Sequence, residues 1–305
     1  MVYKNFDELI QHMKTSSQPQ RVVVAAAEDE HTLKSVLKAQ EDRVIKPILV
    51  GDQAKIKAIL DNLGTNLPKE DIYSANTAAE CANLSVKLVR EGKADFIMKG
   101  HLTTSELLRA VVSKDTGLGT GRTMSHMAIN EVPKYHKLLV TTDGGMILTP
   151  TLEDKKNIII NAVNALRSMG YEEPKVGVLS AAEEINPKLQ DSVDAAALKE
   201  MNRRGQIPNC LVEGPISFDL AVVKERATEK GYNSPCAGDV DILVAPNITA
   251  GNILGKCLVE MAGAKMAGLV MGAKCPIVVT SRGSSAEEKY LALNLAAAIT
   301  QQKGD

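Results

Sequence analysis

The chain has 305 residues, of which 44% are hydrophobic and 24% charged, a composition typical of globular proteins with a sizeable core. At about 150 residues per domain, this length predicts two domains. The 36 basic and 37 acidic residues give a net charge of -1, and aromatic residues make up 3% with no tryptophan, so neither a field that attracts nucleic acid nor a base-stacking platform is expected.

Short β-branched segments alternate with longer segments of helical period along the chain. Several strand segments are continuous apolar runs, as is typical of parallel strands covered on both faces. This alternation predicts an α/β fold with doubly wound parallel sheets. The absence of a long polar linker favours two lobes that share a cleft. The expected strands are 21–27, 47–51, 95–98, 137–142, 175–179, 240–245, 267–271 and 276–280, and the expected helices include 54–62, 78–91, 105–112, 153–169, 193–203 and 253–261.

The turn after the last expected strand carries the clearest anion-binding pattern. In a doubly wound sheet, ligands lie where strands end and helices begin. Here the strand ends at Thr280 and a Ser-Arg-Gly turn precedes a long helix. Serines and glutamates at capping-box spacing, Ser284 with Glu287 and Ser285 with Glu288, are explained by an ordinary helix start. Capping does not explain Arg282, a cation where the helix dipole disfavours one, and this favours a phosphate or carboxylate site.

A glycine-rich segment, 117–126, reads Gly-Leu-Gly-Thr-Gly-Arg-Thr-Met-Ser-His. It is not a dinucleotide fingerprint, because Arg122 stands where that motif needs glycine and no clear strand precedes it. A surface loop and an anion clamp for a nucleotide phosphate both remain open.

Two further turns follow expected strands. Lys99 and Gly100 lie at the end of one strand, where a routine strand-to-helix junction is the alternative to a binding site. Asn247, Gly251 and Asn252 follow another, where the asparagines either bind substrate amides or shape the turn.

Other chemistries lack their motifs. The sequence has no P-loop, no His-Glu-x-x-His and no Gly-x-Ser-x-Gly elbow, and its five histidines never pair at ligand spacing, so no metal is expected. Five widely spaced cysteines fit neither a disulfide framework nor a zinc site. No apolar run approaches the roughly 20 residues of a membrane span, and no signal-peptide core opens the chain, so a cytoplasmic location is expected.

Five segments together resemble the phosphate acetyltransferase and phosphate butyryltransferase family. They are 94–100 (ADFIMKG), 117–129 (GLGTGRTMSHMAI), 214–222 (GPISFDLAV), 242–254 (ILVAPNITAGNIL) and 278–290 (VVTSRGSSAEEKY), and they occur in the family's order. The compact length and the Thr-Gly-Arg-Thr-Met-Ser-His form look more like the butyryl branch.

The resemblance implies two α/β domains of isocitrate/isopropylmalate-dehydrogenase-like architecture, with the active site in the interdomain cleft. The expected domains are 1–134 with 272–305, and 135–271. It also implies a homodimer and the reaction acyl-CoA + phosphate ⇌ acyl phosphate + CoA, without metal or redox cofactor.

Site residues follow from the resemblance by position. Ser281 and Arg282 match a Ser-Arg pair that binds the phosphoryl group and stabilises the transition state. Glu288 stands where the acetyl enzymes place an aspartate thought to deprotonate the CoA thiol, and it also fits the capping box. Arg122 lies where family members bind CoA phosphates. The remaining expected substrate-binding residues are Lys99, Gly100, Thr123, Ser125, His126, Asn247, Gly251, Asn252, Gly283 and Ser284.

Two other classes remain open. The same architecture hosts metal- and nicotinamide-dependent dehydrogenases, for which Asp239 and Asp241 are the nearest candidate ligands. A non-catalytic protein that binds CoA or acyl phosphate is the third reading. The acyl chain is not determined: acetyl, propionyl, butyryl and branched chains all remain open, and the resemblance alone favours butyryl.

Overall fold

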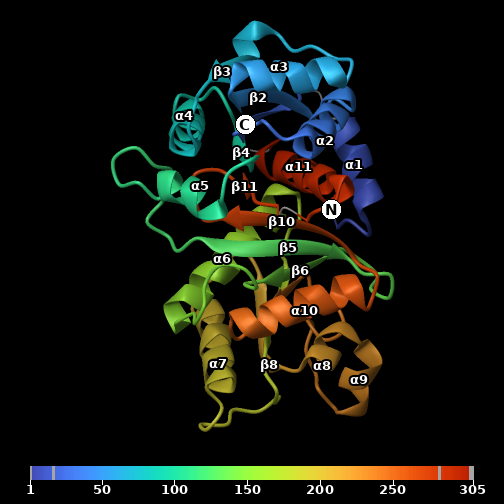
Figure 1. The fold of residues 1–305 in the computed structure, drawn as a ribbon. Helices are drawn as coiled ribbons and strands as arrows, with labels where there is room; N and C mark the ends of the chain where they lie inside the picture. Colours follow the sequence, from blue (N-terminus) through green and yellow to red (C-terminus); the bar gives the residue numbers. More distant parts are fainter. Residues whose placement is uncertain (1, 16–17, 281–282, 302–305) are drawn as a thin grey trace. The chain divides into compact units, whose positions relative to one another are not determined.

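The computed structural model describes residues 2–15, 18–280 and 283–301 as alternating strands and helices (Figure 1). By its internal contacts the chain divides into two compact units. We call residues 7–122 with 267–305 the β1 unit, and residues 1–6 with 123–266 the β6 unit. The domain boundaries expected from the sequence, 1–134 with 272–305 and 135–271, stay a prediction.

The sheet of the β1 unit has the order β3-β2-β1-β4-β11-β10. Its strands are parallel from β3 to β11, whereas β10 runs antiparallel to β11. Parallel strands need both faces covered, and the Val-Val-Val-Ala run of β1 is completely buried. The strands are β1 Gln20–Ala25, β2 Ile45–Gly51, β3 Ile72–Ser74, β4 Phe96–Lys99, β10 Lys265–Met271 and β11 Ile277–Val278.

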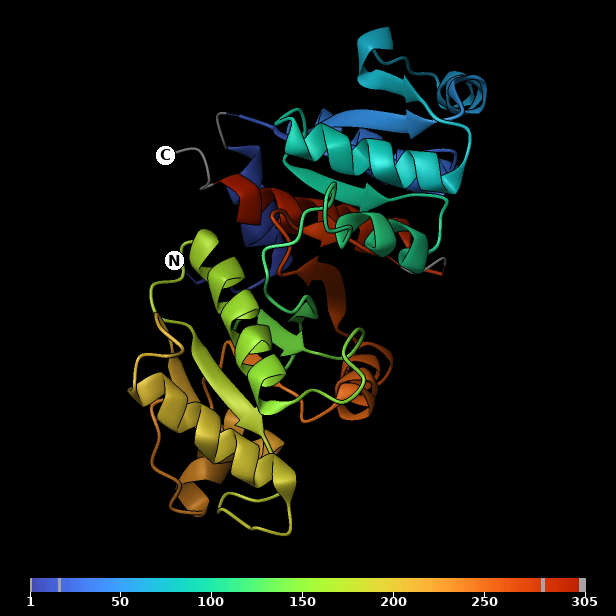
Figure 2. The same ribbon diagram turned by 90° about the vertical axis from the view of Figure 1, so that its left-hand side faces the viewer.

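Helices of the β1 unit cover both faces of this sheet. From β1 the chain steps outward to β2 and β3, then returns past β1 to β4, so right-handed crossovers place α4 on the face opposite α2. Figure 2 shows α4 across one face, and α11 packs against α2 on the other. The helices are α1 Phe6–Lys14, α2 Glu30–Glu41, α3 Gln53–Asn62, α4 Ala78–Arg90, α5 Thr104–Val111 and α11 Ala286–Gln301, with a 3₁₀ turn, η1, at Lys69–Asp71.

The β6 unit repeats this plan with the order β5-β6-β9-β7-β8. Only β5 is antiparallel to its neighbour among these pairs of described strands. Helices α6 and α7 cover one face, and α8, α9 and α10 lie on the other (Figure 1). The elements are β5 Ser125–Glu131, β6 Leu139–Thr142, α6 Leu152–Ser168, β7 Lys175–Leu179, α7 Gln190–Arg203, β8 Leu211–Ile216, α8 Phe218–Val222, α9 Lys224–Glu229, β9 Ile242–Val244 and α10 Ile248–Glu260.

Strand pairing within each unit is therefore mixed, and the expectation of parallel sheets holds only in part. The antiparallel pairs involve β5 and β10, and neither β5 nor β8 was among the strands expected from the sequence. Over the described part of the chain, no helix combines the length and the apolar character that crossing a bilayer requires.

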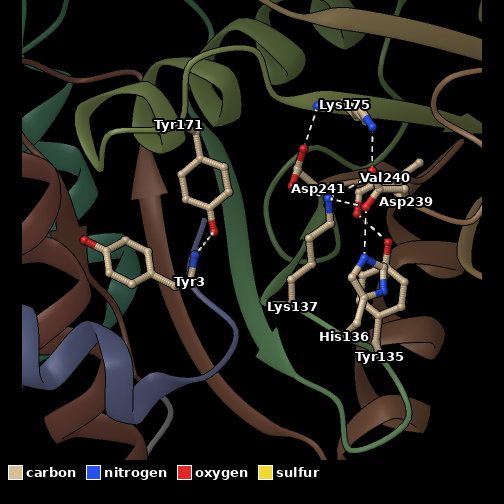
Figure 3. Close-up of polar contacts among 9 residues, drawn as sticks. All are labelled: Tyr3, Tyr135, His136, Lys137, Tyr171, Lys175, Asp239, Val240 and Asp241. Carbon is tan, nitrogen blue, oxygen red and sulfur yellow. Dashed lines mark hydrogen bonds and ion pairs between the residues drawn. The ribbon is translucent and has the colours of Figure 1, made fainter. Parts of the chain in front are cut away.

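An ion network joins the amino ends of β6, β7 and β9 (Figure 3). The Lys137 ammonium lies 2.9 Å from Asp239 Oδ1 and 2.7 Å from Asp241 Oδ1. Lys175 contributes its ammonium to Asp239, at 2.5 Å, and its backbone N–H to Asp241, at 2.7 Å. Burial opposes ionisation of Asp239, but hydrogen bonds from Lys175, Lys137 and His136 outweigh it and hold the pKa of this carboxyl well below its usual range. Both aspartates are thus held by lysines, at the end of the strands opposite to the one where ligands bind in such sheets.

Aromatic residues flank this network. The Tyr135 hydroxyl donates to the carbonyl of Val240 at 2.6 Å, and the Tyr171 hydroxyl accepts the backbone N–H of Tyr3 at 3.2 Å (Figure 3). Burial raises the pKa of Tyr135. These hydrogen bonds hold the segments that precede β7 and β9, together with Tyr3, at the amino ends of the β6-unit strands.

Candidate active site

In both units, helices leave some neighbouring strands toward opposite faces of the sheet. These neighbours include β1 and β4 in the β1 unit and β6 and β9 in the β6 unit. The carboxyl ends of strands at such a switch point form the usual ligand crevice of open α/β sheets. Two of the turns singled out from the sequence, those after β4 and β9, lie at these points.

In the β1 unit, the turn after β4 rests on the turn after β1. Gly100 donates its N–H to Ala25 O at 2.8 Å, and His101 donates to Ala26 O at 2.6 Å. A β-carbon on Gly100 would lie 2.1 Å from Ala26 O, so only glycine fits. Gly100 is therefore required for the close approach of the two turns, which brings the residues after β1 and β4 together.

A cavity of about 190 Å³ opens at this switch point. Its walls come from four segments that are far apart in the sequence: the start of α2, the turn after β4, the end of β11 and the first turn of α11. The lining residues are Asp29, His31, Thr32, Lys99, Gly100, His101, Leu102, Thr280 and Lys289.

Two buried lysines face this cavity. Lys99 is 8% exposed, and its ammonium donates to the carbonyls of Gly100 at 3.3 Å and Leu102 at 3.1 Å. Lys289 is 4% exposed and donates to Ser284 O at 3.0 Å. Burying a charge is costly unless it is compensated, so the buried Lys289 ammonium, with its hydrogen bond to Ser284 O, favours an anion in the cavity.

One carboxylate, Asp29, shares the cavity as the N-cap of α2. It accepts the Thr32 backbone N–H at 3.2 Å and also the Thr32 hydroxyl. Burial opposes its ionisation, but the Thr32 hydrogen bonds and the positive charge of Lys289 outweigh burial and hold the Asp29 pKa below its usual value.

The start of α11 forms the capping box that the sequence predicts. Ser285 N–H donates to Glu288 Oε2 at 3.0 Å, and Glu288 N–H donates to Ser285 Oγ at 3.1 Å. Glu288 is thus the capping carboxylate of α11, and its role as thiol base stays a prediction. Gly283 is exposed and Ser284 is half-buried, whereas the expected catalytic pair Ser281 and Arg282 lies outside the described residues.

The glycine-rich loop is anchored along one side. Thr120 Oγ1 donates to Gly272 O at 2.6 Å, and Lys274 N–H donates to Leu118 O at 2.9 Å. Arg122 follows Gly121, whose φ is 80°, and is exposed. The loop is thus an anchored turn that leaves Arg122 at the surface.

In the β6 unit, the turn after β6 is organised by Asp143. This buried carboxylate accepts N–H groups from Gly145 at 2.8 Å, Met146 at 2.9 Å and Ile147 at 3.3 Å. It also accepts the N–H of His126 at 3.1 Å. Four backbone donors satisfy the charge, so Asp143 holds the turn in one conformation.

His126 lies against this turn. A β-carbon on Gly145 would come within 3.0 Å of the imidazole ring, so the glycine leaves room for it. Burial lowers the pKa of His126, and the nearby Asp143 charge opposes that shift without cancelling it. A histidine kept neutral at a strand end can accept a proton or donate a hydrogen bond to a substrate.

The start of α10 meets the same turn. Asn247 caps the helix by accepting the Ala250 N–H at 3.0 Å, and Asn252 Nδ2 donates to Gly144 O at 3.1 Å. A β-carbon on Gly251 would lie 2.5 Å from the Asp143 carbonyl oxygen, so this glycine is needed for the close approach. Turn shaping therefore accounts for Asn247 and Gly251.

Thr123 and Ser125 contact α6 rather than this turn. Thr123 Oγ1 donates to Asp154 Oδ1 at 3.0 Å. Asn161 Nδ2 donates to Thr123 O at 3.0 Å and to Ser125 Oγ at 2.9 Å. Both hydroxyl residues are thus engaged in holding the start of β5 to α6.

Sequence reasoning missed Asp143, Lys289 and Asp29. Asp143 follows a recognised strand within Thr-Thr-Asp-Gly-Gly, a strand-end acid before two glycines that could have been singled out. Lys289 carries no local signal, because a lysine in the first turn of a helix usually faces solvent. Within residues 2–15, 18–280 and 283–301, no three His, Cys, Asp or Glu side chains gather in a way that could hold a metal ion.

A family model described as "Phosphate acetyl/butaryl transferase" matches residues 5–85 and 73–297. The chain belongs to this family of phosphate acyltransferases. It is 40% identical over 277 residues to a phosphate acetyltransferase of Thermotoga maritima, covering 91% of this chain and 94% of that protein. It is 39% identical over 300 residues to a phosphate butyryltransferase of Clostridium acetobutylicum, covering 98% and 99%. The resemblance noted from five segments is thus confirmed over nearly the whole chain.

Solved structures agree with this assignment. A branched-chain phosphotransacylase from Enterococcus faecalis superposes with a TM-score of 0.80 at 32% identity, covering 92% of this chain and 99% of that one. A 4-hydroxythreonine-4-phosphate dehydrogenase from Burkholderia phymatum superposes with a TM-score of 0.58 at 15% identity, covering 93% and 99%, which shows a shared fold alone. The α/β class is confirmed, with a mixed sheet.

Proposed function

We propose that this phosphate acyltransferase exchanges a short acyl chain, with butyryl preferred, between coenzyme A and inorganic phosphate. The observation that carries the phosphate assignment is the cavity at the β1/β4 switch point, because buried ammonium groups there suit a small anion. The assignment of coenzyme A rests on the family match. The preference for butyryl rests on sequence similarity: the alignment with a phosphate butyryltransferase covers 98% of this chain and 99% of that protein. A relative of nearly equal identity is named phosphate acetyltransferase, and the acyl-CoA series described below distinguishes the two specificities.

The proposed reaction needs no covalent acyl-enzyme. Toward acyl-CoA, the CoA thiolate attacks the carbonyl carbon of the acyl phosphate, the carbon–oxygen bond to phosphate breaks, and inorganic phosphate leaves with the electron pair. In reverse, a phosphate oxygen attacks the thioester and the thiolate leaves. Binding both substrates together supplies most of the required proximity.

Charge develops on the carbonyl oxygen and on phosphate during this exchange. Arg282 and Ser281 are the proposed donors to these oxygens, because fixed donors aimed at developing charge are usually the largest catalytic contribution. Glu288 is the proposed thiol base. A thiol pKa near 8.5 against about 4.3 for a glutamate means that partial burial of the carboxylate, or a cation near the sulfur, must narrow the gap.

We assign Lys99 and Gly100 to phosphate binding. Arg122 is proposed to bind a CoA phosphate, and His126 with Asn252 to contact the substrate near the β6/β9 switch point. The remaining expected substrate-binding residues are proposed to shape these sites. They are Thr123, Ser125, Asn247, Gly251, Gly283 and Ser284.

We also propose a homodimer, formed through α10. This helix is apolar, yet only Gly251 and Leu258 are buried, while Ile253 is 57% and the adjoining Met261 85% exposed. Large exposed apolar residues on one element favour an interface with a second copy.

Phosphate-dependent release of free thiol tests the reaction. The protein is mixed with C2, C3, C4 and branched acyl-CoAs, with and without phosphate, and thiol is followed with a chromogenic reagent. Release that requires phosphate and peaks at four carbons supports the proposal. A peak at two carbons replaces butyryl by acetyl, and no release from any acyl-CoA by the folded protein rejects the proposed function.

A further inference from the structure

Lys289 has no role in the mechanism above, yet it is among the most buried charged groups of the β1 unit. It projects from the first turn of α11 into the switch-point cavity and is 4% exposed. Its ammonium has three donors, and Ser284 O, at 3.0 Å, is the acceptor that the described structure supplies. The group is desolvated but incompletely hydrogen-bonded, which is an expensive state for an isolated cation.

No carboxylate among the described residues forms an ion pair with Lys289 within 4.0 Å. Asp29 feels its charge across the cavity, but the Asp29 carboxylate is already hydrogen-bonded to Thr32. Lys99 adds a second buried ammonium on the opposite turn. Among the described residues that line the cavity, Asp29 is therefore the carboxylate whose charge interacts with that of Lys289, and it is already engaged.

The size of the cavity limits what can neutralise this charge. Sites for cofactors and drug-sized ligands usually measure about 300–1,000 Å³. The volume here, about 190 Å³, is below that range and leaves room for a small tetrahedral oxyanion. The backbone N–H groups at the start of α2 do not account for anion binding in this cavity, because the Asp29 side chain caps the helix.

We propose that Lys289, beside Lys99, contacts the phosphoryl group of the substrate and is a binding residue for inorganic phosphate. The identity of the anion as a substrate rests on the proposed function. In this arrangement Lys289 holds phosphate at the β1/β4 switch point, next to Thr280, the residue that precedes the Ser281-Arg282 pair in the chain.

Direct binding of inorganic phosphate tests this inference without any acyl transfer. Calorimetric Kd values are measured at constant pH and ionic strength for the full chain and three variants: Lys289→Met, Asp29→Asn and Lys34→Met. Lys289→Met removes the charge but keeps the side-chain length, and it should weaken binding at least about tenfold, the size of one charge-assisted hydrogen bond. Lys34→Met is the matched control, since Lys34 is half exposed on α2 and pairs with Glu30, and its Kd should stay within about twofold of wild type.

Asp29→Asn makes the net charge of the cavity more positive, whereas Lys289→Met makes it less positive. Asparagine is as good an N-cap as aspartate, so α2 should stay folded while the cavity loses its one negative charge. Phosphate should then bind more tightly. This variant keeps the inference testable if Lys289→Met fails to fold, because a Kd that is unchanged or weaker in Asp29→Asn overturns it.

Two further measurements are needed. One distinguishes inorganic phosphate from the phosphates of CoA as the ligand of Lys289, and the other distinguishes failure of this inference from failure of the proposed function. The Kd for 3′,5′-ADP, which carries the 3′-phosphate and the first 5′-phosphate of CoA, should not change in Lys289→Met; weakening of this ligand in place of phosphate overturns the inference. In turnover, the variant should raise KM for phosphate and leave KM for acyl-CoA unchanged, a split that loss of stability alone would not produce. Lys289-dependent phosphate binding without thiol release from any acyl-CoA would reject the proposed function and retain the phosphate site.

Discussion

An ideal β-carbon on Gly100 would lie 2.1 Å from the carbonyl oxygen of Ala26. The turn after β4 therefore rests directly on the turn after β1, and the cavity at the switch point depends on this contact. Gly100→Ala should lower the free energy of unfolding by about 1–3 kcal/mol, because backbone must move to admit one methyl group.

Gly119→Ala is the matched control, since nothing lies within 4 Å of a β-carbon at that position. Urea denaturation of both variants measures the difference. Equal stability of the two would contradict the tight contact between the turns.

Glu288 is both the capping carboxylate of α11 and the proposed thiol base, and one substitution separates the two roles. Glutamine keeps an acceptor oxygen at the capping-box position, so Glu288→Gln should leave the melting temperature near wild type. If Glu288 is the base, turnover should be abolished.

Ser285→Ala should have the opposite effect, a loss of stability without a loss of turnover. It removes the hydroxyl that accepts the Glu288 N–H and should cost about 0.5–2 kcal/mol of stability while retaining turnover. Normal turnover by Glu288→Gln would leave Glu288 with its capping role alone.

Arg282 is proposed to stabilise the charge that develops during transfer. Arg282→Ala should lower kcat about 10²–10³-fold, the usual effect of removing one fixed donor. Arg109→Ala, an exposed arginine in the last turn of α5, serves as the control with the same change of charge. Near wild-type turnover of the Arg282 variant would remove this residue from the mechanism.

His126 predicts a pH dependence of stability. Burial lowers its pKa in the folded protein, so the unfolded chain takes up a proton at a higher pH than the folded chain does. The stability that neutral His126 allows is complete above the unfolded pKa of about 6.5 and is lost as pH falls below it. Between pH 7.5 and 5, wild type should therefore lose more unfolding free energy than His126→Gln, measured by urea denaturation at each pH. Parallel curves for the two proteins would show that His126 titrates alike in both states.

The proposed homodimer predicts that charge on α10 separates the subunits. Ile253→Asp with Met261→Asp places two carboxylates on the exposed apolar side of this helix and should produce a monomer by light scattering after size exclusion. Val112→Asp alters a residue of similar exposure, 56%, on the β1 unit and should leave the mass unchanged. A monomeric wild type, or a dimer that tolerates both changes, would refute an interface at α10.

The local pattern of the sequence was sufficient for the secondary structure that surrounds the site. Continuous apolar runs marked β1, β4 and β9, and the Ser285–Glu288 spacing predicted the cap of α11, because burial on both faces and helix capping depend on neighbours in the chain. The strand β5 was missed, since it directly follows a glycine-rich loop and shows little apolar alternation. Motifs along most of the chain also carried the family resemblance, which comparison with relatives confirmed.

Tertiary structure alone decided which of these turns meet. Lys99 and Lys289 are far apart in the sequence and line one cavity because β1, β4 and β11 are neighbours in the sheet, and strand order is set by long-range packing that no local pattern encodes. The same holds for Asp143, whose carboxylate looks like a free acid in the sequence but is satisfied by four backbone N–H groups in the fold. Local chemistry determined which residues could bind an anion, and the pairing of distant strands determined which of them share a cavity.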